Sequence, residues 1–134
     1  MAVLDTGIYP HEGLKDRITG FYDVFRKSQV SYDDNDHKNH VCGIIGGDNC
    51  TSDDRFRGVA PGSSLIAMKV LDVPGNCYVS DILTGLKWIR DHRAELGIHI
   101  VNISVGSCSR KNIRIFRKLS HINKATSFLV CVLG

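Results

Sequence analysis

The amino-acid sequence predicts an α/β domain, in which a three-layer, doubly wound and mainly parallel β-sheet carries helices on both faces. Two features support this prediction. Apolar runs of strand length alternate along the chain with segments whose apolar residues recur at helical spacing. Several of these runs are almost continuously apolar, which is typical of strands covered on both faces. Because parallel strands are joined by right-handed crossovers, the connecting helices pack onto the sheet from either side.

Five segments predict the strands of this sheet. Each is a short apolar or alternating run, and most are bounded by turn-forming residues such as Gly, Pro, Asn, Asp and Ser. In chain order they are residues 1–4, 18–24, 64–71, 98–103 and 128–133.

Three segments between these strands predict helices. In the first, the polar stretch 33–36 leads at once into the small and apolar run 41–45, as where a loop enters a buried helix. In the second, which runs from Ser80 as the N-cap to about residue 94, apolar residues recur on one face. The third, residues 111–124, is amphipathic and strongly basic.

Two residues occupy positions at which α/β domains commonly carry functional side chains. Asp5 directly follows the first strand, and the working residues of open α/β sheets lie at the carboxyl ends of strands. Asn35 or Asp36 can cap the first helix, so His37 would sit in its first turn, where a neighbouring carboxylate can tune an imidazole. Taken alone, each has a simpler interpretation: Asp5 is a turn residue or a helix cap, and His37 is an ordinary polar residue of a helix start.

Length and composition fit one globular domain. The chain has 134 residues, 43% of them hydrophobic and 23% charged. No apolar run approaches the ~18 residues that a membrane-spanning helix requires, so we predict no membrane contact. The start of the chain, MAVLDTGIY, has no basic segment and no long apolar core, so we expect no signal peptide, and the localisation stays open.

The five cysteines do not form a metal-binding or disulfide pattern. Their number is odd, they are widely spaced, and no CxxC occurs. We therefore predict neither a zinc site nor a disulfide framework, and we interpret Cys42 and Cys131 as small buried side chains.

The charge of the chain is unevenly distributed. Residues 1–95 carry all 14 acidic residues and 11 of the 17 Lys and Arg residues, a net charge of −3, whereas residues 96–134 carry six basic residues and no acidic one, a net charge of +6. Such a basic block can attract nucleic acid. No aromatic or base-reading pattern accompanies it, so we interpret it as a solvated helix face and predict no nucleic-acid partner.

Four motifs occur in one order along the chain. They are V-L-D-T-G-I at residues 3–8, N-D-H-K-N-H-V-C-G at 35–43, R-G-V-A-P-G at 57–62 and V-N-I-S-V-G at 101–106. Together they resemble the first half of a subtilisin-like serine endopeptidase, a subtilase of peptidase family S8. The resemblance runs to about residue 106 and more weakly beyond it, and it implies a partial subtilisin-like fold over residues 1–134.

The resemblance implies catalytic roles for two residues. Asp5 matches the triad aspartate, which orients the histidine and stabilises its cation. His37 matches the triad histidine, the general base that takes the serine proton and later protonates the leaving amine. His40 matches a second histidine of the family, which is structural. The implied activity is serine-type endopeptidase.

The resemblance also implies a substrate site. Ser104, Val105 and Gly106 match the strand that pairs with an extended substrate backbone. The segment 76–78 matches the facing edge, so that a peptide or protein substrate would lie between two strands as added β-structure.

The sequence departs from the family pattern near these motifs. Lys38 and Asn39 stand where the family has Gly and Thr, and a lysine close to His37 should lower the pKa of the imidazole. Gly13 stands where the family often has an aspartate that binds calcium. We therefore predict no metal site and no cofactor, although calcium occurs in the family.

The nucleophile is missing from the sequence. Subtilases carry it in a G-T-S-x-A-x-P segment, which does not occur here, and the last predicted strand stops at Gly134, where the family's oxyanion asparagine would follow. We expect a truncated chain that is inactive alone.

Three interpretations follow from the sequence. The chain is the Asp/His half of a subtilase that requires a Ser-bearing complementary segment, or an inactive remnant that binds peptide or such a segment, or a basic nucleic-acid-binding module.

Overall fold

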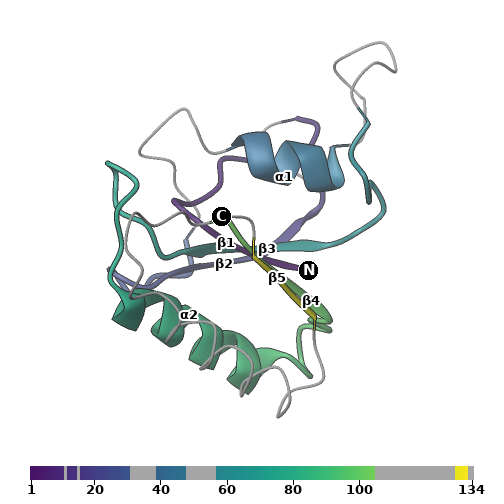
Figure 1. The fold of residues 1–134 in the computed structure, drawn as a ribbon. Helices are drawn as coiled ribbons and strands as arrows, with labels where there is room; N and C mark the ends of the chain where they lie inside the picture. The colour runs from purple at the N-terminus through teal and green to yellow at the C-terminus, as the bar shows by residue number, and fades with distance from the viewer. Residues whose placement is uncertain (11, 15, 31–38, 48–56, 105–128, 133–134) are drawn as a thin grey trace.

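The computed structural model describes residues 1–10, 12–14, 16–30, 39–47, 57–104 and 129–132 (Figure 1). Within these ranges the chain forms five strands and two helices. In chain order they are β1 (Ala2–Asp5), β2 (Ile18–Asp23), α1 (Asn39–Gly46), β3 (Leu65–Lys69), α2 (Val79–His92), β4 (Ile100–Ile103) and β5 (Leu129–Val132).

The described strands form a single parallel sheet in the order β2-β3-β1-β4-β5. In Figure 1, α1 lies on one side of this sheet and α2 on the other, which makes three layers. The predicted α/β fold with a parallel sheet is therefore confirmed. Because the strands all run in one direction, their carboxyl ends meet at one edge of the sheet, which we call the carboxyl edge.

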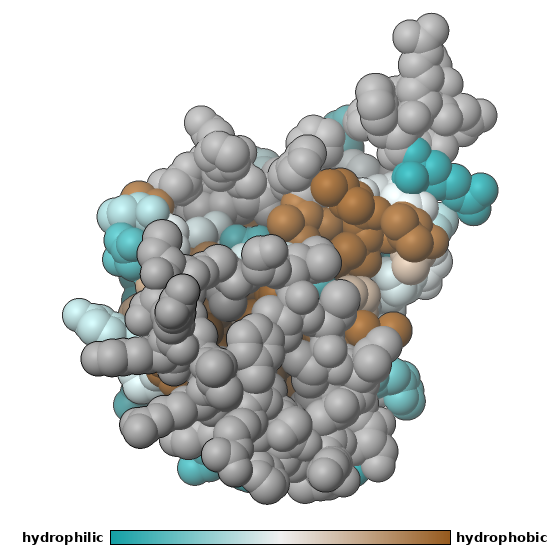
Figure 2. Space-filling view, viewed as in Figure 1, coloured by the Kyte–Doolittle hydropathy of each residue, from teal (hydrophilic) through white to brown (hydrophobic). Residues whose placement is uncertain are grey.

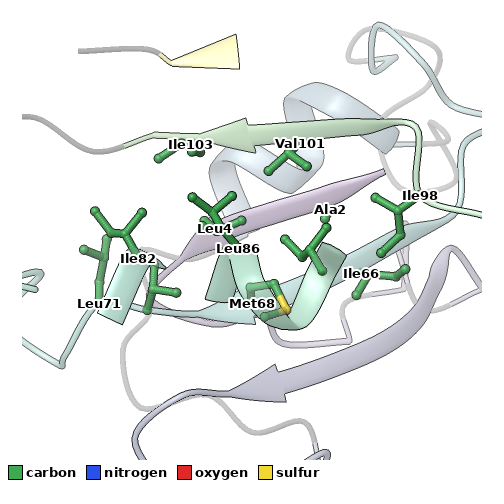
Figure 3. Close-up of a cluster of buried hydrophobic side chains, with 12 residues drawn as sticks. Ala2, Leu4, Ile66, Met68, Leu71, Ile82, Leu86, Ile98, Val101 and Ile103 are labelled. Atoms are coloured by element: carbon green, nitrogen blue, oxygen red, sulfur yellow. The ribbon is translucent and has the colours of Figure 1, made fainter. Parts of the chain in front are cut away.

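Each face of the sheet has its own hydrophobic core. The core on the α2 side contains twelve buried apolar residues, and Figure 3 shows how they converge from the sheet and the helix. A Cβ added at Gly85 of α2 would lie 2.9 Å from a methyl group of Val70, so this helix packs directly on the chain that continues β3. The core on the α1 side contains Val3, Ile8, Leu14, Phe21, Cys42, Leu65 and Ala67.

The N-terminus of α2 differs from the sequence prediction. The N-cap is Tyr78, and Ser80 lies inside the helix. The carboxylate of Asp81 accepts a hydrogen bond from the Tyr78 N–H at 2.8 Å. The helix therefore begins two residues earlier than predicted, and an acidic residue in its first turn binds the backbone N–H of the N-cap.

The backbone carbonyls at the C-terminus of α1 accept hydrogen bonds from a neighbouring segment of backbone. Three successive N–H groups, those of Gly58, Val59 and Ala60, donate to carbonyls at the end of the helix over 2.7–2.9 Å. A Cβ at Gly58 would lie 2.7 Å from the N atom of Gly47, so only glycine allows this approach. The segment before β3 is thereby fixed against α1.

Several predictions fall outside the described residues. They concern the helix at 111–124, the caps Asn35 and Asp36, and His37. β4 begins at Ile100, two residues later than predicted.

Candidate active site

Four polar residues form a row across the carboxyl edge. In the strand register Asp23 of β2 pairs with Lys69 of β3, and Lys69 pairs with Asp5 of β1. β1 and β4 pair through Leu4 and Ile103, so the next position brings Ser104 alongside Asp5. The row therefore reads Asp23, Lys69, Asp5, Ser104, and Asp5 lies on the central strand.

The row faces the α1 side of the sheet. Side chains alternate between the two faces of a strand. Val3 of β1 and Ala67 of β3 belong to the α1-side core, so Asp5 and Lys69, two residues further on, point to the same side. Ile103 of β4 belongs to the opposite core, which places its neighbour Ser104 on the α1 side as well. The first helix and the predicted triad aspartate thus lie on one face.

Asp5 is the last residue of β1, and it is held at both its backbone and its side chain. Its carboxylate Oδ1 accepts hydrogen bonds from the N–H of Thr6 at 2.6 Å and from the Thr6 hydroxyl at 3.2 Å. Its backbone carbonyl accepts from the N–H of Val70 at 2.9 Å. Both described bonds to the carboxylate use Oδ1, so Oδ2 has capacity for a further donor.

Lys69 fixes the turn that follows Asp5. Its side chain is only 3% exposed. The ammonium Nζ donates to the carbonyl of Thr6 at 2.6 Å and to the carbonyl of Leu71 at 3.2 Å. Because Thr6 in turn binds the Asp5 carboxylate, Lys69 limits the movement of the peptide that orients Asp5.

The two outer members of the row are also fixed by hydrogen bonds. The buried carboxylate of Asp23 accepts from the N–H groups of Phe25 at 2.7 Å and Arg26 at 3.2 Å, which stabilises the turn after β2. On the other side, the buried amide of Asn102 donates to the Ser104 hydroxyl at 2.7 Å. Ser104 therefore has a defined side-chain orientation beside Asp5.

The charge of Asp5 acts on a side chain of α1. Burial, and secondly the negative charge of Asp5, raise the pKa of the Cys42 thiol to about 12. The prediction that Cys42 is a buried small side chain is confirmed. Cys42 lies in the first half of α1, so the first half of this helix lies within electrostatic reach of the carboxylate.

The predicted substrate-binding segment 76–78 follows a tight turn at the same edge. The Asn76 N–H donates to the Asp72 carboxylate at 2.6 Å, and the Asp72 N–H donates to the carbonyl of Asn76 at 2.8 Å. Gly75 has a φ of 85°, a conformation that favours glycine. Tyr78 at the end of the segment is 80% exposed, so its ring is available for contact with another molecule.

The structure thus places some of the predicted site residues and leaves others untested. Asp5 ends β1, and Ser104 directly follows the neighbouring strand β4. His37, Val105 and Gly106 lie outside the described residues, and their roles stay predictions.

Sequence reasoning missed three polar residues that organise the site: Asp23, Lys69 and Asn102. Each is a polar residue at a buried position of an apolar strand, and that interruption was the available signal.

Among the described residues no three His, Cys, Asp or Glu side chains lie close enough together to hold a metal ion. Gly13 is buried and offers no side-chain ligand. The absence of a calcium site stays a prediction. In the same part of the chain no helix has both the length and the apolarity that spanning a membrane requires.

Comparisons with known proteins agree with this architecture. The family model for the subtilase family matches residues 1–134. Serine protease AprX of Bacillus subtilis is 38% identical over 109 residues, which cover 79% of this chain and 25% of AprX. Subtilisin Savinase of Lederbergia lenta is also 38% identical over 109 residues, which cover 81% of this chain and 38% of that protein.

Among solved structures, Sphericase has the same fold, with a TM-score of 0.80 at 24% identity. The match covers 98% of this chain and 44% of Sphericase, so the chain spans less than half of these relatives. The sheet, the carboxyl edge and the full-length family match lead to one conclusion: this chain belongs to the subtilase family.

Proposed function

We propose that this chain supplies the aspartate and the histidine of a Ser-His-Asp triad, Asp5 and His37, for serine-type hydrolysis of peptide bonds. The serine would come from a segment with the family's nucleophile motif. The position of Asp5 is the observation that carries the proposal. Its carboxylate ends the central strand at the carboxyl edge, Thr6 holds its Oδ1, and its charge reaches Cys42 of α1.

In this proposal each residue has a separate chemical task. Asp5 accepts the Nδ1–H of His37 on Oδ2, which fixes the imidazole tautomer and stabilises the imidazolium. The other ring nitrogen takes the proton of the serine as it attacks the carbonyl carbon, and returns it to the leaving amine. The product is an acyl-enzyme that water then hydrolyses.

The substrate would bind as an additional strand. We propose that an extended peptide or protein segment pairs with the backbone of Ser104, Val105 and Gly106, directly beyond β4. The segment 76–78, in which Asn76 and Tyr78 are exposed, would form the facing edge. The hydrogen bond from Asn102 to Ser104 supports this placement, because it fixes the start of the strand that receives the substrate.

We propose that the chain alone has no useful peptidase activity. Its sequence contains no G-T-S-x-A-x-P segment. Losing triad members costs roughly 10⁴- to 10⁶-fold in rate, and losing an oxyanion donor costs ~10²- to 10³-fold more. A second candidate function follows from the same absence: a subtilase remnant that binds peptide or a complementary half without catalysis.

A serine-reactive fluorophosphonate probe separates the two candidates. The isolated chain should stay unlabelled. A mixture with the separately produced portion of Subtilisin Savinase that follows its matched region should become labelled on the Savinase serine, and His37→Ala should abolish that labelling. Labelling of the isolated chain would refute its proposed inactivity. If the two chains form a complex that stays unlabelled, the result supports the second candidate function, a non-catalytic subtilase remnant.

A further inference from the structure

The loop between β3 and α2 carries the segment 76–78, and little apolar packing holds it. Residues 73–76 and Tyr78 are exposed, whereas Cys77 packs, partly buried, against the α2-side core. In Figure 2 the hydrophobic surface gathers over the end of α1, and hydrophilic colours prevail on the side where this loop lies. The position of the segment therefore depends mainly on its hydrogen bonds.

Asp72 provides most of these hydrogen bonds. Its carboxylate Oδ1 accepts from the N–H of Asn76 at 2.6 Å, and its own N–H donates to the carbonyl of Asn76 at 2.8 Å. Its carbonyl accepts from the N–H of Gly75 at 3.0 Å. Burial, and secondly the charges of Asp81 and Asp72, raise the pKa of the Cys77 thiol, so both carboxylates act on the middle of the segment. Asp72 thus closes the turn that leads into the segment 76–78.

The residues directly before Asp72 are joined to the turn that carries Asp5. The N–H groups of Val70 and Leu71 donate to the carbonyl of Asp5 at 2.9 and 3.2 Å. The ammonium of Lys69 bridges the carbonyls of Thr6 and Leu71 at 2.6 and 3.2 Å. Four hydrogen bonds therefore fix the end of β3 to the end of β1, and Asp72 is the first residue beyond this junction.

We infer that Asp72 is a positioning residue of the proposed peptidase, which holds the segment 76–78 at a fixed place relative to Asp5. The inference rests on the proposed function, since this segment would form one edge of the substrate site. Asp72 acts through the backbone of Asn76 and has no contact with the substrate. A substrate that pairs with a fixed edge is aligned with the triad, and a misplacement of about 1 Å can cost ~10²-fold in rate.

Amide hydrogen exchange of the chain, measured by NMR, tests the positioning directly. Asp72→Ala removes the acceptor of the Asn76 N–H, so the exchange rate of this amide should rise by ~10-fold or more. The amides of Val70 and Leu71, which bind Asp5, should keep their rates. Asp72→Asn retains a side-chain oxygen and should exchange like the unmodified chain.

Asp16→Ala is the matched control. Asp16 is also an exposed aspartate in a turn, but this turn precedes β2 and lies at the end of the sheet opposite to the carboxyl edge. Its replacement should leave the exchange of Asn76 unchanged. An Asn76 amide that exchanges equally fast in the unmodified chain and in Asp72→Ala would overturn the inference.

Hydrolysis of a peptide by the chain mixed with the Savinase portion gives the second measurement. Asp72→Ala should lower kcat/KM by ~10-fold or more and leave the pH dependence of kcat unchanged, because the pair of Asp5 and His37 is not altered. Asp72→Asn should restore most of this loss. Ile89→Val, which truncates a fully buried residue of the α2-side core, lowers stability and should leave kcat/KM unchanged.

The two measurements separate this inference from its basis. If the mixture does not hydrolyse peptides, the triad proposal fails, and the exchange of Asn76 alone decides whether Asp72 fixes the segment. If exchange at Asn76 rises in Asp72→Ala while kcat/KM stays the same, Asp72 has only a structural role and the inference is wrong. It is also wrong if Asp72→Asn is as impaired as Asp72→Ala, since the charge and not the acceptor would then be required.

Discussion

The two faces of the sheet are built from the same strands, but they hold different kinds of side chain. On the α2 side the core contains twelve buried residues, and all of them are apolar. On the α1 side seven buried apolar residues adjoin Asp23, Lys69 and Asn102, which are the buried polar and charged residues of the described chain. Asp5 and Ser104 lie on that same side.

This difference shows that one face of the sheet mainly stabilises the fold, whereas the other face holds the candidate active site. Burying apolar area stabilises the fold without direction, so the α2 side can consist of interchangeable aliphatic residues. Buried polar groups need partners at fixed distances, and the hydrogen bonds of Lys69 and Asn102 provide them. Variants on the two faces should therefore have different effects.

The largest effect is expected from Asp5→Ala on the α1 side. Without the carboxylate, His37 loses its orienting partner, so peptidase activity of the chain mixed with the Savinase portion should fall by ~10⁴-fold in kcat. Steady-state hydrolysis of a peptide substrate measures this fall in kcat. Asp91→Ala, which removes an exposed carboxylate on α2, should leave kcat unchanged, and equal losses would contradict the role of Asp5.

Leu86→Ala on the α2 side should lower stability and leave binding intact. Leu86 is fully buried, so its truncation should cost about 3 kcal/mol in the free energy of unfolding, measured by urea denaturation. The neighbouring exposed residue provides the control, Lys87→Ala, which should change stability by less than about 0.5 kcal/mol. A loss of Savinase binding by folded Leu86→Ala would show that the two faces are not separable.

Lys69→Met should affect both stability and activity. It removes the donor to the carbonyls of Thr6 and Leu71, and leaving such groups unsatisfied should destabilise the chain by about 2 kcal/mol. Because Thr6 orients Asp5, kcat of the mixture should fall even at temperatures where the variant is fully folded. A variant with reduced stability and unchanged kcat would restrict Lys69 to a structural role.

The Cys42 thiol should make stability depend on alkaline pH. Folding raises its pKa from 9.0 to about 12, so the unfolded chain loses the proton first, and stability is complete below pH 9 and falls as the pH rises towards 12. Between pH 8 and pH 10 the loss should be about 1.4 kcal/mol. Urea denaturation of the unmodified chain and of Cys42→Ala at each pH isolates the contribution of this thiol. An identical pH dependence of the free energy of unfolding in both proteins would contradict the prediction.

The sequence predicted most of the fold because hydrophobic patterns report burial. The strands of the described residues and the helix α2 follow from apolar runs and helical spacing. The cap of α2 was assigned wrongly, since the choice between Tyr78 and Ser80 depends on where the Asp81 carboxylate reaches. Patterns along the chain do not show which of several local hydrogen bonds forms.

The site was predicted only in part, for a similar physical reason. Asp5 and Ser104 could be identified because they stand at the carboxyl ends of apolar runs and match family motifs. Lys69 of β3 acts through register, because it pairs with Asp5 of β1, whereas Asn102 supports Ser104 through a local hydrogen bond. Register across a parallel sheet joins residues far apart in sequence, so it becomes visible only in the structure.

The most direct test of the catalytic edge is the pKa of His37, measured by NMR titration of the chain and of Asp5→Asn. If the carboxylate lies within bonding distance of the imidazole, its replacement by an amide should lower the pKa of His37 by about one unit or more, while Asp91→Asn should leave it unchanged. A titration of His37 that does not respond to Asp5→Asn would contradict the pairing of these two residues.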